Sequence, residues 1–121
     1  MHRFLTNFIK TTIFTSFFLF SSTGFSETLT SSIAAELIDE DGHVVIPSNY
    51  TIIDNSAFKD QRVVSAEIPS SIVTIGSYAF SNTPLSNVVI SNGVEVIHAH
   101  AFSGANLKSV SIPNSVTTIE E

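Results

Sequence analysis

The sequence predicts a β-rich solenoid, in which stacked 22-residue repeats form a parallel sheet with short turns or 3-10 segments on the return side. Residues of one type recur every 22 positions without insertion, the chain is rich in Ser, Thr, Ile, Val and Phe, and it has no cysteine. β-branched and aromatic residues favour strands, and a fixed period of this length is typical of solenoids. A small exported domain without disulfides needs such regular stacking, or a larger assembly, for its stability.

Residues 1–26 have the layout of a secretory signal peptide. The apolar run Thr11–Phe20 follows a basic start, whose candidate positive charges are His2, Arg3 and Lys10. Small residues before Glu27 suit cleavage there. An uncleaved anchor is the alternative, although polar residues interrupt the stretch and make it a poor membrane span. We therefore expect a secreted or cell-surface protein with no membrane span after cleavage.

Charge and composition exclude several function classes. After cleavage three cations, Lys59, Arg62 and Lys108, face eleven carboxylates, which gives a net charge of −8 with His neutral. A nucleic-acid partner is not expected, because phosphate neutralisation needs clustered Lys and Arg. The lack of cysteine excludes a thiolate nucleophile and Cys-based metal sites. No phosphate loop or catalytic triad stands out, so we expect neither an enzyme nor a cofactor.

Residues 27–45 lack the full repeat pattern and are predicted to cap the N-terminal end of the core, which a solenoid otherwise exposes. We expect a hairpin of two strands, Ala35–Ile38 and His43–Ile46, around the turn Asp39–Gly42. A short helix at Ser32–Ile38 is the alternative. The acidic turn lacks the ligand spacing of a calcium loop, so we interpret it as a solvated turn.

Residues 46–121 hold three full repeats and a partial one. The copies span 46–67, 68–89, 90–111 and 112–121. One core position of each predicted strand is an isoleucine in every copy, namely Ile46, Ile68, Ile90 and Ile112. Val88 and Ile90 occupy alternate positions of the strand predicted at 87–90, so a period of two places both in the core. The intervening residues then point outward.

The return half of each repeat carries a small residue followed by a large aromatic one. These pairs are Ala57-Phe58, Ala79-Phe80 and Ala101-Phe102. Tight turns or a second short strand fit the repeat length better than a full helix. We expect the phenylalanines of successive copies to stack inside the solenoid, and we favour this over an aromatic box for a cofactor. The ninth pattern position holds Asn49, Ser71, Gly93 or Ser115, and Gly93 predicts a local weakness because it has no side chain to bond buried backbone.

These motifs resemble a known family. Ile68–Phe80 reads I-P-S-S-I-V-T-I-G-S-Y-A-F, and Ile112–Ile119 reads I-P-N-S-V-T-T-I. Over about Val44–Glu121 the chain resembles the BspA-like leucine-rich repeat family. The resemblance implies a leucine-rich-repeat solenoid and a surface or secreted protein, often an adhesin that binds host or matrix proteins or other cells. It supplies no catalytic residues.

Two histidines have the spacing of strand-borne metal ligands, His98 and His100. Alternate residues of a strand share one face, but no third ligand is identifiable and the pair falls at variable turn positions. We interpret both as surface histidines and expect no metal site.

Outward strand positions vary between copies while inward positions do not, as in repeat scaffolds that separate specificity from stability. The predicted binding residues are Ser65, Glu67, Asn87, Val89, Ser109 and Ser111. Their polar, weakly charged character suits a protein or glycan ligand. The alternatives are a structural spacer, or a fragment of a larger repeat adhesin with its ligand contacts elsewhere; a metal-dependent enzyme is less favoured.

The fourth copy stops at Glu121, before its Ala-Phe pair and without a polar cap. We expect this end either to continue in a longer array or to pair with another chain, which includes self-association.

Overall fold

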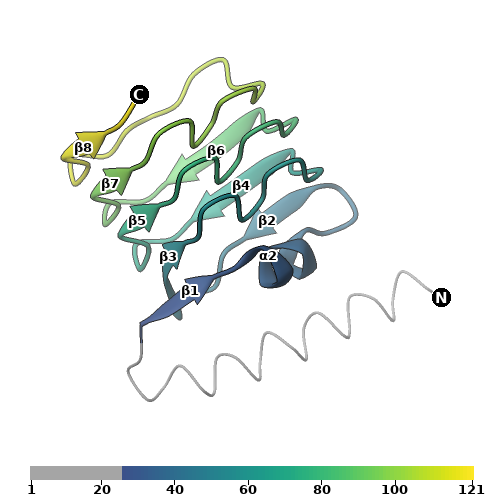
Figure 1. The fold of residues 1–121 in the computed structure, drawn as a ribbon, viewed down its shortest axis with the longest axis horizontal. Coiled ribbons are helices and arrows are strands. Elements are labelled where there is room, and N and C mark those ends of the chain that lie inside the picture. The colour runs from purple at the N-terminus through teal and green to yellow at the C-terminus, as the bar shows by residue number, and fades with distance from the viewer. Residues whose placement is uncertain (1–25) are drawn as a thin grey trace.

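Two parallel sheets form the sides of a solenoid in the computed structural model, which describes residues 26–121. The predicted signal peptide, except Ser26, lies outside the described residues. Figure 1 shows the chain winding through successive coils, in which the strands from β1 to β7 join the two sheets in turn. Sheet A consists of β1 (Glu27–Leu29), β3 (Tyr50–Ile53), β5 (Thr74–Ile75), β7 (Val96–Ile97) and β8 (Thr118–Ile119). Sheet B consists of β2 (His43–Val45), β4 (Ser65–Ile68) and β6 (Asn87–Ile90), and α2 (Ser31–Leu37) precedes it.

The register of both sheets follows the 22-residue period of the sequence. Ile68 pairs with Ile90 in sheet B, and Ile75 pairs with Ile97 in sheet A. The predicted solenoid class is therefore confirmed. Its return side carries a second sheet of short strands, because two-residue strands fit the available length where a helix would not.

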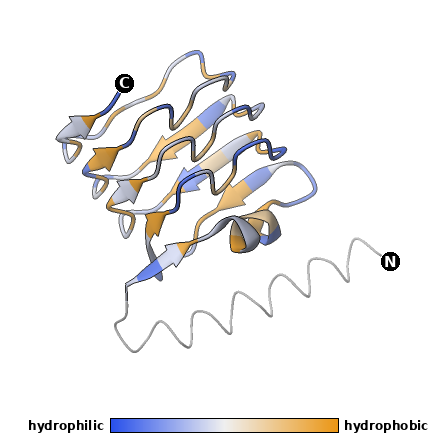
Figure 2. Cartoon of the chain, viewed as in Figure 1, coloured by the Kyte–Doolittle hydropathy of each residue, from blue (hydrophilic) through white to orange (hydrophobic). Residues whose placement is uncertain are grey.

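The core lies between the sheets and is filled by the predicted inward positions. Ala66 and Ile68 of β4 are buried, whereas Glu67 between them is exposed. Figure 2 shows apolar segments on the strands of both sheets in successive coils. Phe80 stacks on Phe58 with ring centroids 4.9 Å apart and on Phe102 at 5.5 Å. The predicted column of phenylalanines is thus present.

The turns at the two ends of each coil have different chemistry. After β4, the carbonyl of Pro69 accepts a hydrogen bond from the Ile72 N–H at 3.1 Å, which closes a tight turn. In the third copy Ser91 replaces this proline and donates its N–H to Ile68 O at 3.0 Å. A proline could not make that bond, because it has no N–H. On the other side, the Ala-Phe turns bond from coil to coil, as in the 2.7 Å bond from Phe80 N–H to Ala101 O.

The predicted N-terminal hairpin is wrong, because Ser31–Leu37 forms α2 and β2 pairs in parallel with β4. The helical alternative describes the segment better. Ile33, Ala34 and Leu37 follow helical spacing, and all three pack against the core. Ala, Leu and Glu also favour a helix intrinsically. The cap is therefore a modified coil, in which α2 stands between β1 and β2 where other coils have the Ala-Phe turn.

Gly93 is not the weak point that its missing side chain predicts. Its N–H donates to Ser115 Oγ of the next coil at 2.9 Å, and that hydroxyl donates to Val94 O at 2.7 Å. Gly93 also has φ +146°, and a Cβ there would lie 2.2 Å from Ser70 O. The glycine is therefore required by close backbone approach.

The unsatisfied polar atoms lie at the same pattern position in the earlier coils. Among the described residues, Asn49 Oδ1 and Ser71 Oγ are buried without a hydrogen-bond partner. The other amide atom of Asn49, Nδ2, donates to Glu27 Oε2 at 3.0 Å.

Sheet B ends at β6, although a fourth strand is expected at 109–112. Val110 and Ile112 are 39% and 40% exposed, whereas Val88 and Ile90 one coil earlier are both 8% exposed. These side chains therefore lie outside the packed core that holds their equivalents in the preceding coil. Sheet A does continue into the last coil through β8.

Candidate binding surface on sheet B

The outward side chains of sheet B form a surface that we call the strip. It consists of His43, Val45, Ser65, Glu67, Asn87 and Val89. The register arranges them in two rows across the three strands. One row runs from His43 through Ser65 to Asn87, and the other from Val45 through Glu67 to Val89. Side chains alternate along a strand, so the buried Val44, Ala66 and Val88 between the rows hold the strip against the core.

The second row has two exposed valines on either side of a carboxylate. Val45 is 53% exposed and Val89 is 54% exposed, and they are the most exposed large apolar residues before the last coil. The side chain of Glu67 between them is 59% exposed. This combination offers apolar contact area around a hydrogen-bond acceptor.

The first row is linked to the second through His43. Its Nδ1 lies 2.6 Å from Ser65 Oγ, and its Nε2 lies 3.7 Å from Glu67 Oε1. The contacts orient His43 and leave the Asn87 amide exposed as a further donor and acceptor.

Four of the predicted site residues come together as expected, namely Ser65, Glu67, Asn87 and Val89. Ser109 and Ser111 do not join them, because the segment that carries them is not paired with β6. The prediction missed His43 and Val45. Counting 22 residues back from Ser65 and Glu67 reaches both, but the interpretation of this segment as a hairpin cap assigned them to a different element.

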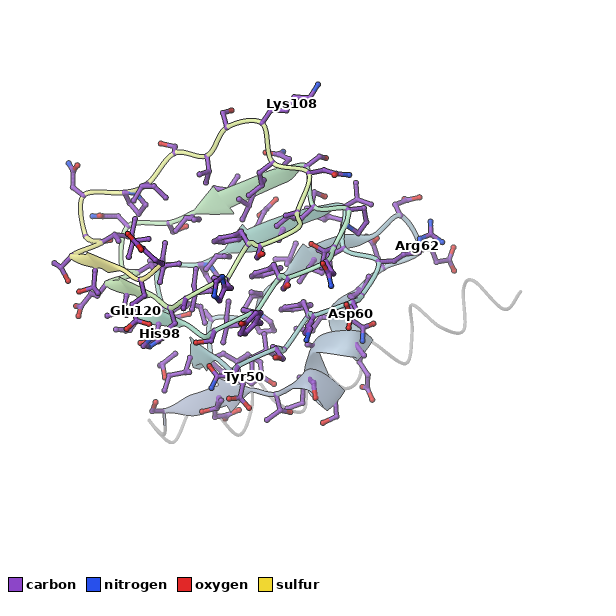
Figure 3. The ribbon with its side chains drawn as sticks, turned by 45° about the horizontal axis from the view of Figure 1, so that its top comes forward. Tyr50, Asp60, Arg62, His98, Lys108 and Glu120 are labelled. Atoms are coloured by element: carbon purple, nitrogen blue, oxygen red, sulfur yellow. The ribbon has the colours of Figure 1, made fainter. Side chains whose placement is uncertain are left out.

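A second pair of titratable side chains lies beside sheet A, where His98 and Glu120 point toward each other (Figure 3). His98 Nδ1 lies 2.9 Å from Glu120 Oε2. This hydrogen bond is the main cause that lowers the pKa of Glu120 below its ordinary value of 4.5. Within residues 26–121, no group of three or more His, Cys, Asp or Glu side chains is placed to hold a metal ion.

His100 belongs to a ridge on the Ala-Phe turns. Its ring lies 4.9 Å from that of Tyr78, and Lys59 Nζ lies 5.4 Å from the Tyr78 centroid. The ridge thus packs against itself through aromatic and cation–π contacts. The strip has no such internal packing of its valines, which makes it the better candidate for an external partner.

The carboxylate of Asp39, in the acidic turn before β2, is already hydrogen-bonded to the backbone of that turn. Asp39 Oδ1 accepts hydrogen bonds from the N–H groups of Asp41 and His43, both at 2.9 Å. These bonds shape the turn that leads into the strip.

No helix within residues 26–121 is long and apolar enough to cross a membrane, since α2 has only seven residues.

The fold and the repeat pattern agree with known proteins. A family model described as BspA type leucine rich repeat region (6 copies) matches residues 38–121. The crystal structure of a leucine-rich repeat protein from Bacteroides capillosus ATCC 29799 is similar, with a TM-score of 0.66 and 26% sequence identity over 79% of this chain and 87% of that chain. Among curated proteins, none matches the chain.

Repeats of this family suggest a protein-interaction module, and the fold is typically a non-enzymatic binding scaffold. Its members are often secreted or surface proteins. The family model covers more than two thirds of the sequence and agrees with the observed coils, so the chain belongs to the BspA-type leucine-rich repeat family.

Proposed function

We propose that this protein is secreted or displayed at the cell surface and mediates adhesion by binding a protein ligand through the strip. The observation that carries the proposal is the pair of half-exposed valines beside Glu67 on a sheet whose other face is fully packed. Exposed apolar residues grouped on a rigid face are typical of interaction surfaces.

The scaffold supports this role because the strip can vary without cost to the core. Its outward positions hold six residues of five kinds, whereas the inward positions of the same strands remain apolar. A ligand would therefore meet a surface already held in one geometry, which lowers the entropy lost on binding.

The chemistry of the second row favours a protein over a glycan. Val45 and Val89 can contact aliphatic or aromatic side chains, and Glu67 can pair with a Lys or Arg of the partner. The hydroxyl and amide groups of the first row would add hydrogen bonds. Binding to glycans alone is an outcome that the experiment below distinguishes.

A second candidate function is an assembly segment that packs against another coil. Val110 and Ile112 are exposed in the last coil, and Ile119 is 60% exposed. Contact with another chain through these residues would make the apparent mass depend on concentration. Analytical ultracentrifugation of the full chain measures this, and a single monomeric species at all concentrations would contradict it.

The test of adhesion uses matched substitutions on the two sheets. The full chain is displayed on bacterial cells, and adhesion to an immobilised extracellular-matrix protein extract and to a glycan array is measured. Replacing Val45 and Val89 by serine removes apolar contact, and we expect a loss of roughly tenfold or more in adhesion to the protein extract. The control changes Ile52 and Val73 to serine on the sheet A side, where they are 37% and 38% exposed.

The control variant should retain adhesion. Undiminished adhesion of the strip variant would contradict the proposal, and so would an equal loss in both variants. Adhesion confined to the glycan array would replace the protein ligand by a glycan.

A further inference from the structure

Residues 109–112 have the sequence of a strand but are not paired, although the chain is bonded in register on both sides of them. Before the segment, Asn106 N–H donates to Leu85 O of the preceding coil at 2.9 Å. After it, Ser115 Oγ bonds Gly93 N–H and Val94 O, and β8 pairs with β7. The segment is therefore tethered at both ends within reach of β6.

The edge of β6 that faces this segment is unpaired in sheet B. Its backbone groups can bond a further strand, as Asn87–Ile90 already do with β4 on the other edge. Val110 and Ile112 repeat the alternation of Val88 and Ile90, so a strand here would turn both toward the core.

We infer that Ser109–Ile112 is a strap that closes onto β6 as the fourth strand of sheet B. Closure continues the 22-residue register, so Ser109 pairs with Asn87 and Ser111 with Val89. The two serines then extend the two rows of the strip. Closure gains backbone hydrogen bonds and buries part of Val110 and Ile112, and it costs the conformational entropy of the strap.

The consequence for binding rests on the proposed function. A ligand that contacts Ser109 and Ser111 binds only the closed form, so it shifts the strap toward closure. The strap would then favour ligands long enough to span four strands over those that span three. The apparent affinity would equal the affinity of the closed form multiplied by the fraction of molecules whose strap is closed.

Disulfide trapping tests closure without any ligand. The chain has no native cysteine, and neighbouring strands place in-register Cα atoms at about 5 Å, within the range that a disulfide spans. The test variant is Val89→Cys/Ser111→Cys, which forms a bridge only when the strap closes. The matched control is Glu67→Cys/Val89→Cys, whose positions are already paired.

We expect both variants to oxidise fully, the test variant about tenfold or more slowly, because its closed form is the minor one. The bridged test variant should also protect the amides of residues 109–112 from hydrogen exchange, relative to its reduced form. A third variant, Glu67→Cys/Ser111→Cys, places the thiols two strands apart, beyond disulfide reach, and should stay reduced.

Two results would overturn the inference. If the test variant stays reduced while the control oxidises, the strap does not reach β6. If it oxidises as fast as the control and its amides are protected before oxidation, the strap is a permanent strand. Neither result depends on adhesion, so failure of the strap is distinguishable from failure of the proposed function.

Discussion

Single side chains stabilise the solenoid by meeting their equivalents one coil away. Phe80 is fully buried between Phe58 and Phe102, with interplanar angles of 8° and 5°. This contact was predictable from sequence, because an unbroken 22-residue period brings equivalent residues into register. The pairing of Ser115 with Gly93 was not, because it depends on how closely adjacent backbones approach.

Truncating the central phenylalanine should cost more than truncating the last one. Phe80→Ala is expected to lower the free energy of unfolding by about 3–5 kcal/mol, since it opens a cavity in the column. Phe102→Ala should cost less, because Phe102 is only partly buried. Urea unfolding followed by circular dichroism measures both, and equal costs would contradict the observed packing.

Gly93 should tolerate substitution less well than Gly104. Gly93→Ala brings Cβ within 2.2 Å of the Ser70 backbone carbonyl, whereas in Gly104→Ala the nearest atom is the Asn82 side chain at 2.6 Å. The Asn82 side chain can move, whereas Ser70 lies within the turn closed by the bond from Ile72 N–H to Pro69 O, so we expect Gly93→Ala to cost roughly 1–3 kcal/mol more. Thermal unfolding of the two variants provides the comparison; a larger loss for Gly104→Ala would rule out this explanation.

The contact between His98 and Glu120 should contribute to stability only above acidic pH. Since the folded-state pKa of Glu120 is lowered from 4.5, its contribution is present above that value and is lost as the pH falls through the folded pKa. In His98→Ala the Glu120 pKa should rise toward 4.5. Carboxyl-carbon NMR titration of both proteins measures it, and an unchanged pKa would show that His98 is not the cause.

Among the elements, the inner strands were predictable, whereas the N-terminal cap and the strap were not. β4 and β6 follow from alternation and period together. The hairpin prediction for residues 35–46 failed because a four-residue alternation outweighed the helical spacing of Ile33, Ala34 and Leu37. The strap has the same apolar alternation as β6, so the pattern alone predicts a paired strand and does not reveal that the segment is unpaired.

Equivalent isoleucines in a paired strand and in the strap should differ in their effect on stability. Ile68 of β4 is fully buried, whereas Ile112 is 40% exposed. We expect Ile68→Ala to cost about 2–5 kcal/mol and Ile112→Ala under about 1 kcal/mol. Similar losses in chemical denaturation would mean that the strap is as well packed as β4.

For the whole molecule, the stacked coils separate stability from recognition. The core positions of the strands stay apolar from coil to coil, and the strip changes from strand to strand on this frame. Most of the strip was predictable, because outward positions follow from inward ones. His43 and Val45 were missed, since the coil to which they belong has lost its Ala-Phe pair and was not recognised as a coil.

Masking one outward position at a time tests most directly that the strip is the binding surface. Single cysteines at Val45, Glu67 or Val89 can be coupled to maleimide-polyethylene glycol after the full chain has folded, with cysteines at Ile52 and Val73 as controls. We predict that adhesion to the extracellular-matrix protein extract is blocked by coupling at the three strip positions and unaffected at the two on the sheet A side. Undiminished adhesion after coupling at all three strip positions would contradict the account.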